Sequence, residues 1–385
     1  MKRRIPLAWL QLSREKNRLL VAMAGITFAD ILIFIQLGFQ SALYDSNTRL
    51  QRSLQGDIVL ISPNTRSMIN MSSFPRRRLY QTMNFKGIMS ADALYLDFAK
   101  WKNPHTHQFN TILTIGFNPE KSVFKLPEVS QKLDIVRLSD TMLLDRGTRG
   151  VSQEIINKIV QGKIVFIEIE KRKIAINGSF NIGFSFAAEG HLITSDQNFL
   201  RLFSTRRKVS EVNVGLITLQ PGYEPKSMAV ALQNILPNDV KVLTMQEFIE
   251  FEKNYWAKNT AIGFIFSLGT LLGFVVGTVI VYQILYSDVT EHLPEYATLK
   301  AMGFRDIYLL SVVFQEALIL AILGYIPGCA ISFYLYTLTR NATNLPLFMP
   351  ISRAIAVFVL TVLMCTISGA IAMSKIKSAD PAEIF

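Results

Sequence analysis

Residues 261–286 read AIGFIFSLGTLLGFVVGTVIVYQILY and carry no charged side chain. A helix needs about 20 mostly apolar residues to cross roughly 30 Å of bilayer hydrocarbon, so this stretch is long enough. Residues 19–43, 307–338 and 354–373 meet the same condition, and no other stretch of the chain comes close. The sequence therefore predicts four transmembrane helices, one near the start of the chain and three near its end.

The overall composition excludes several classes of protein. Half of the 385 residues are hydrophobic and 18% are charged, against about 25% charged in an average soluble protein. The net charge is +11, but a charged fraction this low argues against a soluble nucleic-acid binder, and the high hydrophobicity argues against disorder. Two cysteines exclude a disulfide scaffold and a thiolate zinc site.

The distribution of lysine and arginine predicts the orientation of the chain. Segment 1–18 carries six positive side chains and is expected to stay in the cytoplasm by the positive-inside rule. It is expected to form a short basic amphipathic helix on the inner membrane surface, with a disordered basic retention signal as the alternative. The first span is interpreted as an uncleaved anchor, because its apolar run is longer than that of a signal peptide. The six are Lys2, Arg3, Arg4, Arg14, Lys16 and Arg18.

Four spans then divide the rest of the chain between the two sides of an inner (cytoplasmic) membrane. Both termini are expected in the cytoplasm, together with loop 287–306 and tail 374–385. Residues 44–258 are expected to form a large periplasmic α+β domain inserted between the first and second transmembrane helices, and 339–353 a short periplasmic loop. The predicted fold class is thus an α-helical membrane protein with one large insert.

Within the insert, apolar runs and turn residues predict short strands and helices. Asn177-Gly178 is a typical hairpin turn and predicts that strand 173–176 is followed by a separate strand 180–187. A further helix is expected to run without a break into the second span. The other predicted strands are 57–62, 111–117, 163–170, 212–219 and 240–243, and the helices are 154–160, 225–236 and 245–256.

No arrangement of residues predicts an active site. The phosphate-binding loop G-x-x-x-x-G-K-[ST] and the G-x-S-x-G nucleophile elbow are both absent from the sequence. His105 and His107 could touch a metal ion on a strand, but Pro104 beside them favours a surface loop. The expectation is a protein that is not an enzyme and has no metal and no cofactor.

Small and polar residues in the spans predict how the helices pack. Glycines at four-residue spacing let helix backbones approach closely, either within one chain or between two copies. Buried carboxyl groups in spans face protein or water, and interhelical hydrogen bonding is preferred here to a proton path. The residues expected to serve packing or dimer contact are Gly269, Gly273, Gly277, Gly324, Gly328, Asp30, Glu316 and Gln36.

The order of these parts resembles the MacB/FtsX-type permease subunits of ABC systems. Cytoplasmic residues 295–304, EYATLKAMGF, resemble that family's "REIGILKALG" coupling segment. The third span, with QEAL at 315–318 followed by Gly324 and Gly328, resembles its "EA…L…G…G" pattern, and ADPAE at 379–383 resembles its "DPAEAL" ending. Pro327, between Gly324 and Gly328, departs from the family pattern. Because proline kinks helices, it is expected to kink the third span.

Three stretches resemble the DevC branch of cyanobacterial exporters in particular. They are ITFADILIFIQLGFQ at 26–40, which includes Asp30, TMLLDRG at 141–147 and LITSD at 192–196. For this branch the resemblance implies export of a lipid-like cargo, a heterocyst glycolipid.

The resemblance also implies a set of partners. A separate ABC ATPase subunit would bind the cytoplasmic face, two copies of the chain would form a homodimer, and no nucleic acid would be bound. The periplasmic domain would engage a membrane-fusion adaptor that joins a TolC-like outer-membrane channel, while membrane lipid surrounds the spans. The alternative is an FtsX-like signalling subunit that activates a periplasmic cell-wall hydrolase. The residues implied to contact the ATPase are Glu295, Leu299, Lys300, Met302, Gly303 and Phe304.

Overall fold

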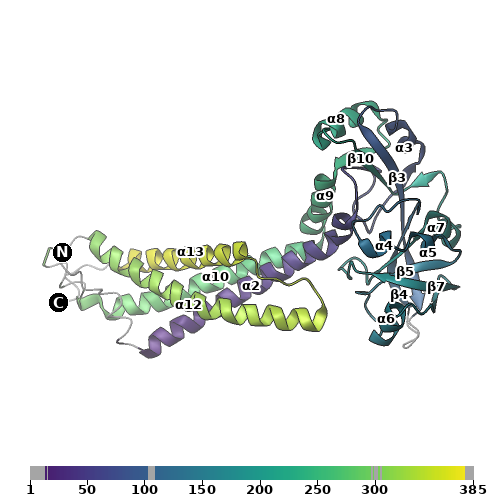
Figure 1. The fold of residues 1–385 in the computed structure, drawn as a ribbon. Helices are drawn as coiled ribbons and strands as arrows, with labels where there is room; N and C mark the ends of the chain where they lie inside the picture. The colour runs from purple at the N-terminus through teal and green to yellow at the C-terminus, as the bar shows by residue number, and fades with distance from the viewer. Residues whose placement is uncertain are drawn as a thin grey trace. The chain divides into compact units, whose positions relative to one another are not determined.

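The computed structural model describes residue 14 and residues 16–102, 109–295, 298, 302–303 and 306–377 (Figure 1). The chain divides into two compact units. The first, here called the helix bundle, combines the residues up to Ala42 with those from Ala261 onward. The second, here called the inserted domain, is Leu43–Thr260.

Four long helices in the described part of the chain are long and apolar enough to cross a membrane. The first continues past the predicted end of its span at residue 43, and its last residues belong to the inserted domain. Pro327 lies inside the third of them, which continues on both sides of it. The four are α2 (Lys16–Ser53), α10 (Ala261–Glu291), α12 (Asp306–Thr343) and α13 (Ile351–Lys377).

The surface of the helix bundle is apolar. Leu271 and Val275 on α10, Phe333 on α12 and Val359 on α13 are all exposed large hydrophobic side chains. Helices that are apolar on every side belong in a core or in a membrane, because water solvates such a surface poorly. Along the sequence, the inserted domain lies between the first of these apolar helices and the other three.

The inserted domain is built on a nine-stranded sheet with the order β11-β1-β10-β3-β4-β8-β5-β7-β6. The pairs β4–β8 and β5–β7 are parallel, and the other pairings within this sheet are antiparallel. Its strands are β1 (Ile58–Ile61), β3 (Ile88–Lys102), β4 (Phe109–Phe117), β5 (Thr141–Asp145), β6 (Val165–Ile169), β7 (Arg172–Phe180), β8 (His191–Ser195), β10 (Val214–Leu219) and β11 (Lys241–Thr244). A separate two-stranded sheet joins β2 (Phe74–Pro75) and β9 (Glu211–Val212).

Helices cover both faces of the large sheet, so alternate residues of a strand enter two different cores. On β1, Ile58 belongs to the core cluster that contains Phe199 and Leu232, whereas its neighbour Val59 belongs to the one that contains Leu54 and Phe248. This explains why the central strands are apolar at consecutive positions. The covering helices are α3 (Arg77–Thr82), α4 (Pro127–Ser130), α5 (Leu133–Arg137), α6 (Gln153–Val160), α7 (Asp196–Leu202), α8 (Pro225–Ile235) and α9 (Met245–Lys258).

The predicted turn at Asn177-Gly178 is wrong, because β7 runs through both residues. A Cβ on Gly178 would lie 2.7 Å from Cδ of Lys132 and 2.8 Å from Cδ2 of Leu143. Gly178 thus lets the side chains of Lys132 and Leu143 pack directly against the backbone of β7. The hairpin turn between β6 and β7 lies instead at Glu170-Lys171, whose φ angles are 48° and 63°. Residues 181–187 form no strand.

The helix predicted to run without a break into the second span is also interrupted. α9 ends at Lys258 and α10 begins at Ala261. Asn259 has a non-helical backbone, with φ −109° and ψ 3°, and its N–H donates to the carbonyl of Tyr255. Asparagine competes with helical hydrogen bonding and favours helix ends. The link between the insert and the second span is therefore a short joint of two residues.

Candidate functional site

Three glycines of α10 lie where this helix approaches its neighbours in the bundle. A Cβ on Gly269 would lie 2.5 Å from Cδ of Gln36, and one on Gly273 would lie 3.1 Å from Cγ1 of Ile33. At Gly277 a Cβ would lie 2.7 Å from Cβ of Ala29 on α2 and would overlap Sδ of Met364 on α13. Larger residues at Gly269 and Gly277 would therefore push α10 away from its neighbours or force them to repack.

Two glycines of α12 serve the same close packing against α2. A Cβ on Gly324 would lie 2.5 Å from Cγ2 of Ile26, and one on Gly328 would lie 2.9 Å from Cβ of Asp30. The approach also allows the Thr27 hydroxyl to donate to the carbonyl of Gly324 at 2.9 Å. The structure thus places all five predicted glycines against helices of the same chain.

Asp30 lies at the centre of this packing and is fully buried. Its Oδ1 is 2.6 Å from the hydroxyl of Thr361 on α13, and that hydroxyl is also 2.9 Å from the carbonyl of Val357. Asp30 therefore joins α2 to α13 directly, while Gly328 brings α12 against the same residue. The contacts are those of an interhelical hydrogen-bonding role.

Glu316, on α12, is fully buried as well. Both of its carboxyl oxygens are buried and make no hydrogen bond within the described part of the chain.

The structure describes three of the six residues expected to contact an ATPase. Glu295 and Met302 are exposed, and Gly303 has φ +91° with no atom within 4 Å of an added Cβ. A positive φ of this size strains any residue with a side chain, so Gly303 shapes the backbone there. Leu299, Lys300 and Phe304 lie outside the described residues, as does the tail motif at 379–383.

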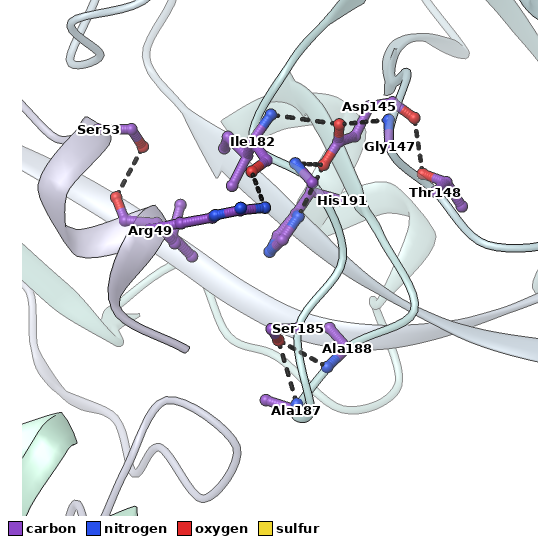
Figure 2. A network of polar contacts seen from close by, with 12 residues as sticks. Arg49, Ser53, Asp145, Gly147, Thr148, Ile182, Ser185, Ala187, Ala188 and His191 are labelled. Atoms are coloured by element: carbon purple, nitrogen blue, oxygen red, sulfur yellow. Dashed lines mark hydrogen bonds and ion pairs between the residues drawn. The ribbon is translucent and has the colours of Figure 1, made fainter. Parts of the chain in front are cut away.

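Asp145, at the end of β5, is a buried polar centre that sequence reasoning missed (Figure 2). Its Oδ1 accepts from the backbone N–H groups of Gly147 at 2.9 Å and Ile182 at 3.2 Å. Its Oδ2 accepts from the N–H of Gly183 at 2.8 Å and lies 3.0 Å from Nδ1 of His191. One carboxylate therefore fixes the loop after β7 and the first residue of β8.

The loop fixed by Asp145 holds the end of α2. Nη1 of Arg49 donates to the carbonyl of Ile182 at 3.3 Å, and Oδ1 of Asn47 accepts from the N–H of Ala187 at 3.0 Å. Figure 2 shows Arg49 reaching this loop beside Asp145 and His191. The TMLLDRG stretch, noted for its family resemblance, thus organises the loop 181–190 that binds the end of α2. This loop is here called the seat of α2. The only signal in the sequence was an acidic residue closing an otherwise apolar strand.

A second buried carboxyl group lies on α9, close to the joint with α10. Glu252 is fully buried; its Oε2 accepts from the N–H of Met68 at 2.8 Å and its Oε1 from Nε1–H of Trp256 at 2.9 Å. Burial raises the pKa of Glu252 to about 7, although these two hydrogen bonds favour the charged form. Glu252 fastens the loop after β1 to the last helix of the inserted domain.

No group of three or more His, Cys, Asp or Glu side chains that could hold a metal ion occurs among the described residues. His105 and His107 fall outside those residues. The one histidine in the buried polar centre, His191, is oriented by Asp145 and serves the seat of α2.

Residues 262–381 match the family model described as FtsX-like permease C-terminal. The matched stretch holds α12, α13 and nearly all of α10. None of the curated proteins matches the chain.

Two solved structures of separate domains are similar to part of the chain. The crystal structure of the periplasmic region of MacB from Actinobacillus actinomycetemcomitans is 10% identical, with a TM-score of 0.35, over 52% of this chain and 94% of that one. The extracellular domain of the noncanonic ABC-type transporter YknZ from Gram-positive bacteria is 12% identical, with a TM-score of 0.31, over 48% and 98%.

Proposed function

We propose that this chain is the membrane subunit of an ATP-driven ABC exporter and relays the motion of a separate ATPase subunit to the inserted domain. The family match of residues 262–381 carries the proposal. A span that precedes a large insert and three spans that follow it fit such a permease. The absence of a phosphate-binding loop from the sequence agrees with ATP hydrolysis on another subunit.

The segment that receives the ATPase is 295–304, and it lies in the cytoplasm with both termini. Its support is the sequence likeness to the coupling segment of MacB/FtsX-type permeases and the exposure of Glu295 and Met302. The six positive side chains of segment 1–18 set this orientation in the inner membrane.

The further partners of the proposal rest on sequence resemblance alone. Two copies of the chain form a dimer, and the inserted domain engages a periplasmic adaptor connected to a TolC-like channel. The cargo is lipid-like, and the resemblance of 26–40, 141–147 and 192–196 to the DevC branch favours a glycolipid of the heterocyst envelope.

Changing Glu295 and Gly303 together tests the coupling role. The double variant Glu295→Gln, Gly303→Ala is expected to keep a folded bundle, yet ATP hydrolysis by the ATPase subunit no longer drives export. The readouts are ATPase rate in reconstituted membranes and the envelope lipid profile of a deletion strain carrying the variant. Gly222→Ala is the control, because Gly222 has a similar φ of +94° and equally open surroundings in the inserted domain. Normal export by the double variant removes this assignment.

The FtsX-like signalling role is the second candidate, and the family name of residues 262–381 keeps it open. In that role the inserted domain would move to activate a cell-wall hydrolase and nothing would be exported. Co-purification separates the two candidates: an adaptor supports the exporter, whereas an amidase or peptidase overturns it.

A further inference from the structure

Arg18, near the start of α2, is bound to the last turn of α10. Its Nη2 donates to the hydroxyl of Ser287 at 2.7 Å, and its Nη1 lies 2.5 Å from Oε2 of Glu291 and 3.6 Å from Oδ1 of Asp288. The Arg18 side chain is 25% exposed and that of Asp288 only 9%. One guanidinium group therefore gathers three polar side chains of a neighbouring helix.

A histidine meets the same carboxylate. Nδ1 of His292 lies 3.8 Å from Oδ1 of Asp288. Asp288 is thus the point at which polar side chains of α2 and of the end of α10 come together.

Arg18 near the start of α2, and Asp288 and Glu291 at the end of α10, each have the charge that is unfavourable at that end of an isolated helix. Acidic residues near a helix C-terminus and basic residues near an N-terminus oppose the helix dipole. The last turn of α10 contains no basic residue, and the first turn of α2 no acidic one. Retention of positive charge in the cytoplasm explains Arg18, but it does not explain Asp288 or Glu291. The pairing across the two helices accounts for all three.

These contacts end where the proposed ATPase-binding segment begins. Glu295, the first residue of that segment, lies three positions after His292 in the sequence. Whatever fixes the last turn of α10 therefore fixes the point from which the segment departs.

We propose that Arg18, Asp288 and Glu291 form an ionic latch that positions segment 295–304 for its ATPase partner. The functional part of this inference rests on the proposed function above. The latch joins the first span to the second at the base of the segment, so displacement of the segment is passed to both helices together.

Charge reversal tests the latch in the full chain, reconstituted in lipid nanodiscs. Arg18→Glu places three carboxylates together and is expected to speed amide hydrogen exchange in 287–295 about tenfold or more, because like-charge repulsion replaces the hydrogen bond to Ser287 and the two ion pairs. The double variant Arg18→Glu, Glu291→Arg restores opposite charges and is expected to return exchange toward the wild-type rate. Lys16→Glu, an exposed position on the same helix, changes the charge equally and is expected to leave exchange unchanged.

Binding of the ATPase gives the second readout. Co-purification of the ATPase subunit is expected to fall in Arg18→Glu and to recover in the double reversal. Arg18→Gln, with an intermediate expected effect, replaces Arg18→Glu if that variant does not fold. Wild-type exchange in both Arg18 variants, or no recovery in the double reversal, overturns the latch. Failure of any ATPase to bind the wild-type chain overturns the proposed function instead, while the exchange result still tests the latch.

Discussion

Replacing Asp145 tests whether one carboxylate holds the seat of α2 together. In Asp145→Ala the backbone N–H groups of Gly147, Ile182 and Gly183 lose their acceptor. A buried N–H without a partner costs about 1–3 kcal/mol, so the expected loss is about 3–9 kcal/mol. This is comparable with the whole stability of a typical domain, about 5–15 kcal/mol.

Asp145→Asn is expected to be much milder. The amide oxygen can still accept from Gly147 and Ile182, whereas the NH₂ group takes the place of Oδ2. His191 can meet that NH₂ through its other tautomer, so only the N–H of Gly183 is stranded. The expected loss is about 1–3 kcal/mol.

Urea unfolding of the full chain in nanodiscs measures both losses. Tryptophan fluorescence follows the inserted domain, because Trp101 is buried in its core. Asp134→Asn is the control, since the Asp134 side chain is 96% exposed; it should change stability by less than about 0.5 kcal/mol. The reasoning is refuted if Asp145→Ala and Asp145→Asn lose the same stability, or if Asp145→Ala unfolds like the wild type.

Two further predictions follow from buried groups. The folded protein holds the Glu252 proton up to about pH 7, above the carboxyl value of 4.5, so the stability of the inserted domain should fall by about 3 kcal/mol as pH rises from 4.5 to 7. In Glu252→Gln this slope and the matching pH titration of the neighbouring Trp256 fluorescence should vanish; an unchanged slope would assign the proton to another group. In the bundle, Gly277→Ala should cost about 1–3 kcal/mol in thermal unfolding. Gly369→Ala, whose Cβ would meet neighbours only at 3.6–3.7 Å, should cost nothing, and equal effects would contradict the packing described.

The spans were predictable because a bilayer demands long apolar runs, and such runs are a local property of the sequence. The helix at 225–236 and the strand at 240–243 were likewise marked by local signals and are confirmed as α8 and β11. The order of the sheet was not predictable. Strand β3 contains Asp92 and Asp97 and lacks a simple alternation, and its partners β4, β6 and β10 are set by contacts distant in the sequence.

The buried polar centres could not be predicted either, because they too depend on contacts between residues distant in the sequence. Asp145 and His191 are 46 residues apart and meet because β5 and β8 pair with Leu144 opposite Leu192. Gly178 misled the turn prediction because a glycine can serve either a turn or a close approach, and only the neighbouring side chains decide between them. Leu299, Lys300 and Phe304 stay predictions from resemblance.

Native mass spectrometry of the complex, purified from its own membranes in a mild detergent, tests the central claim most directly. The account predicts two copies of this chain together with ATPase subunits, and an adaptor in the same assembly. A complex that contains the chain but no ATPase subunit would contradict it.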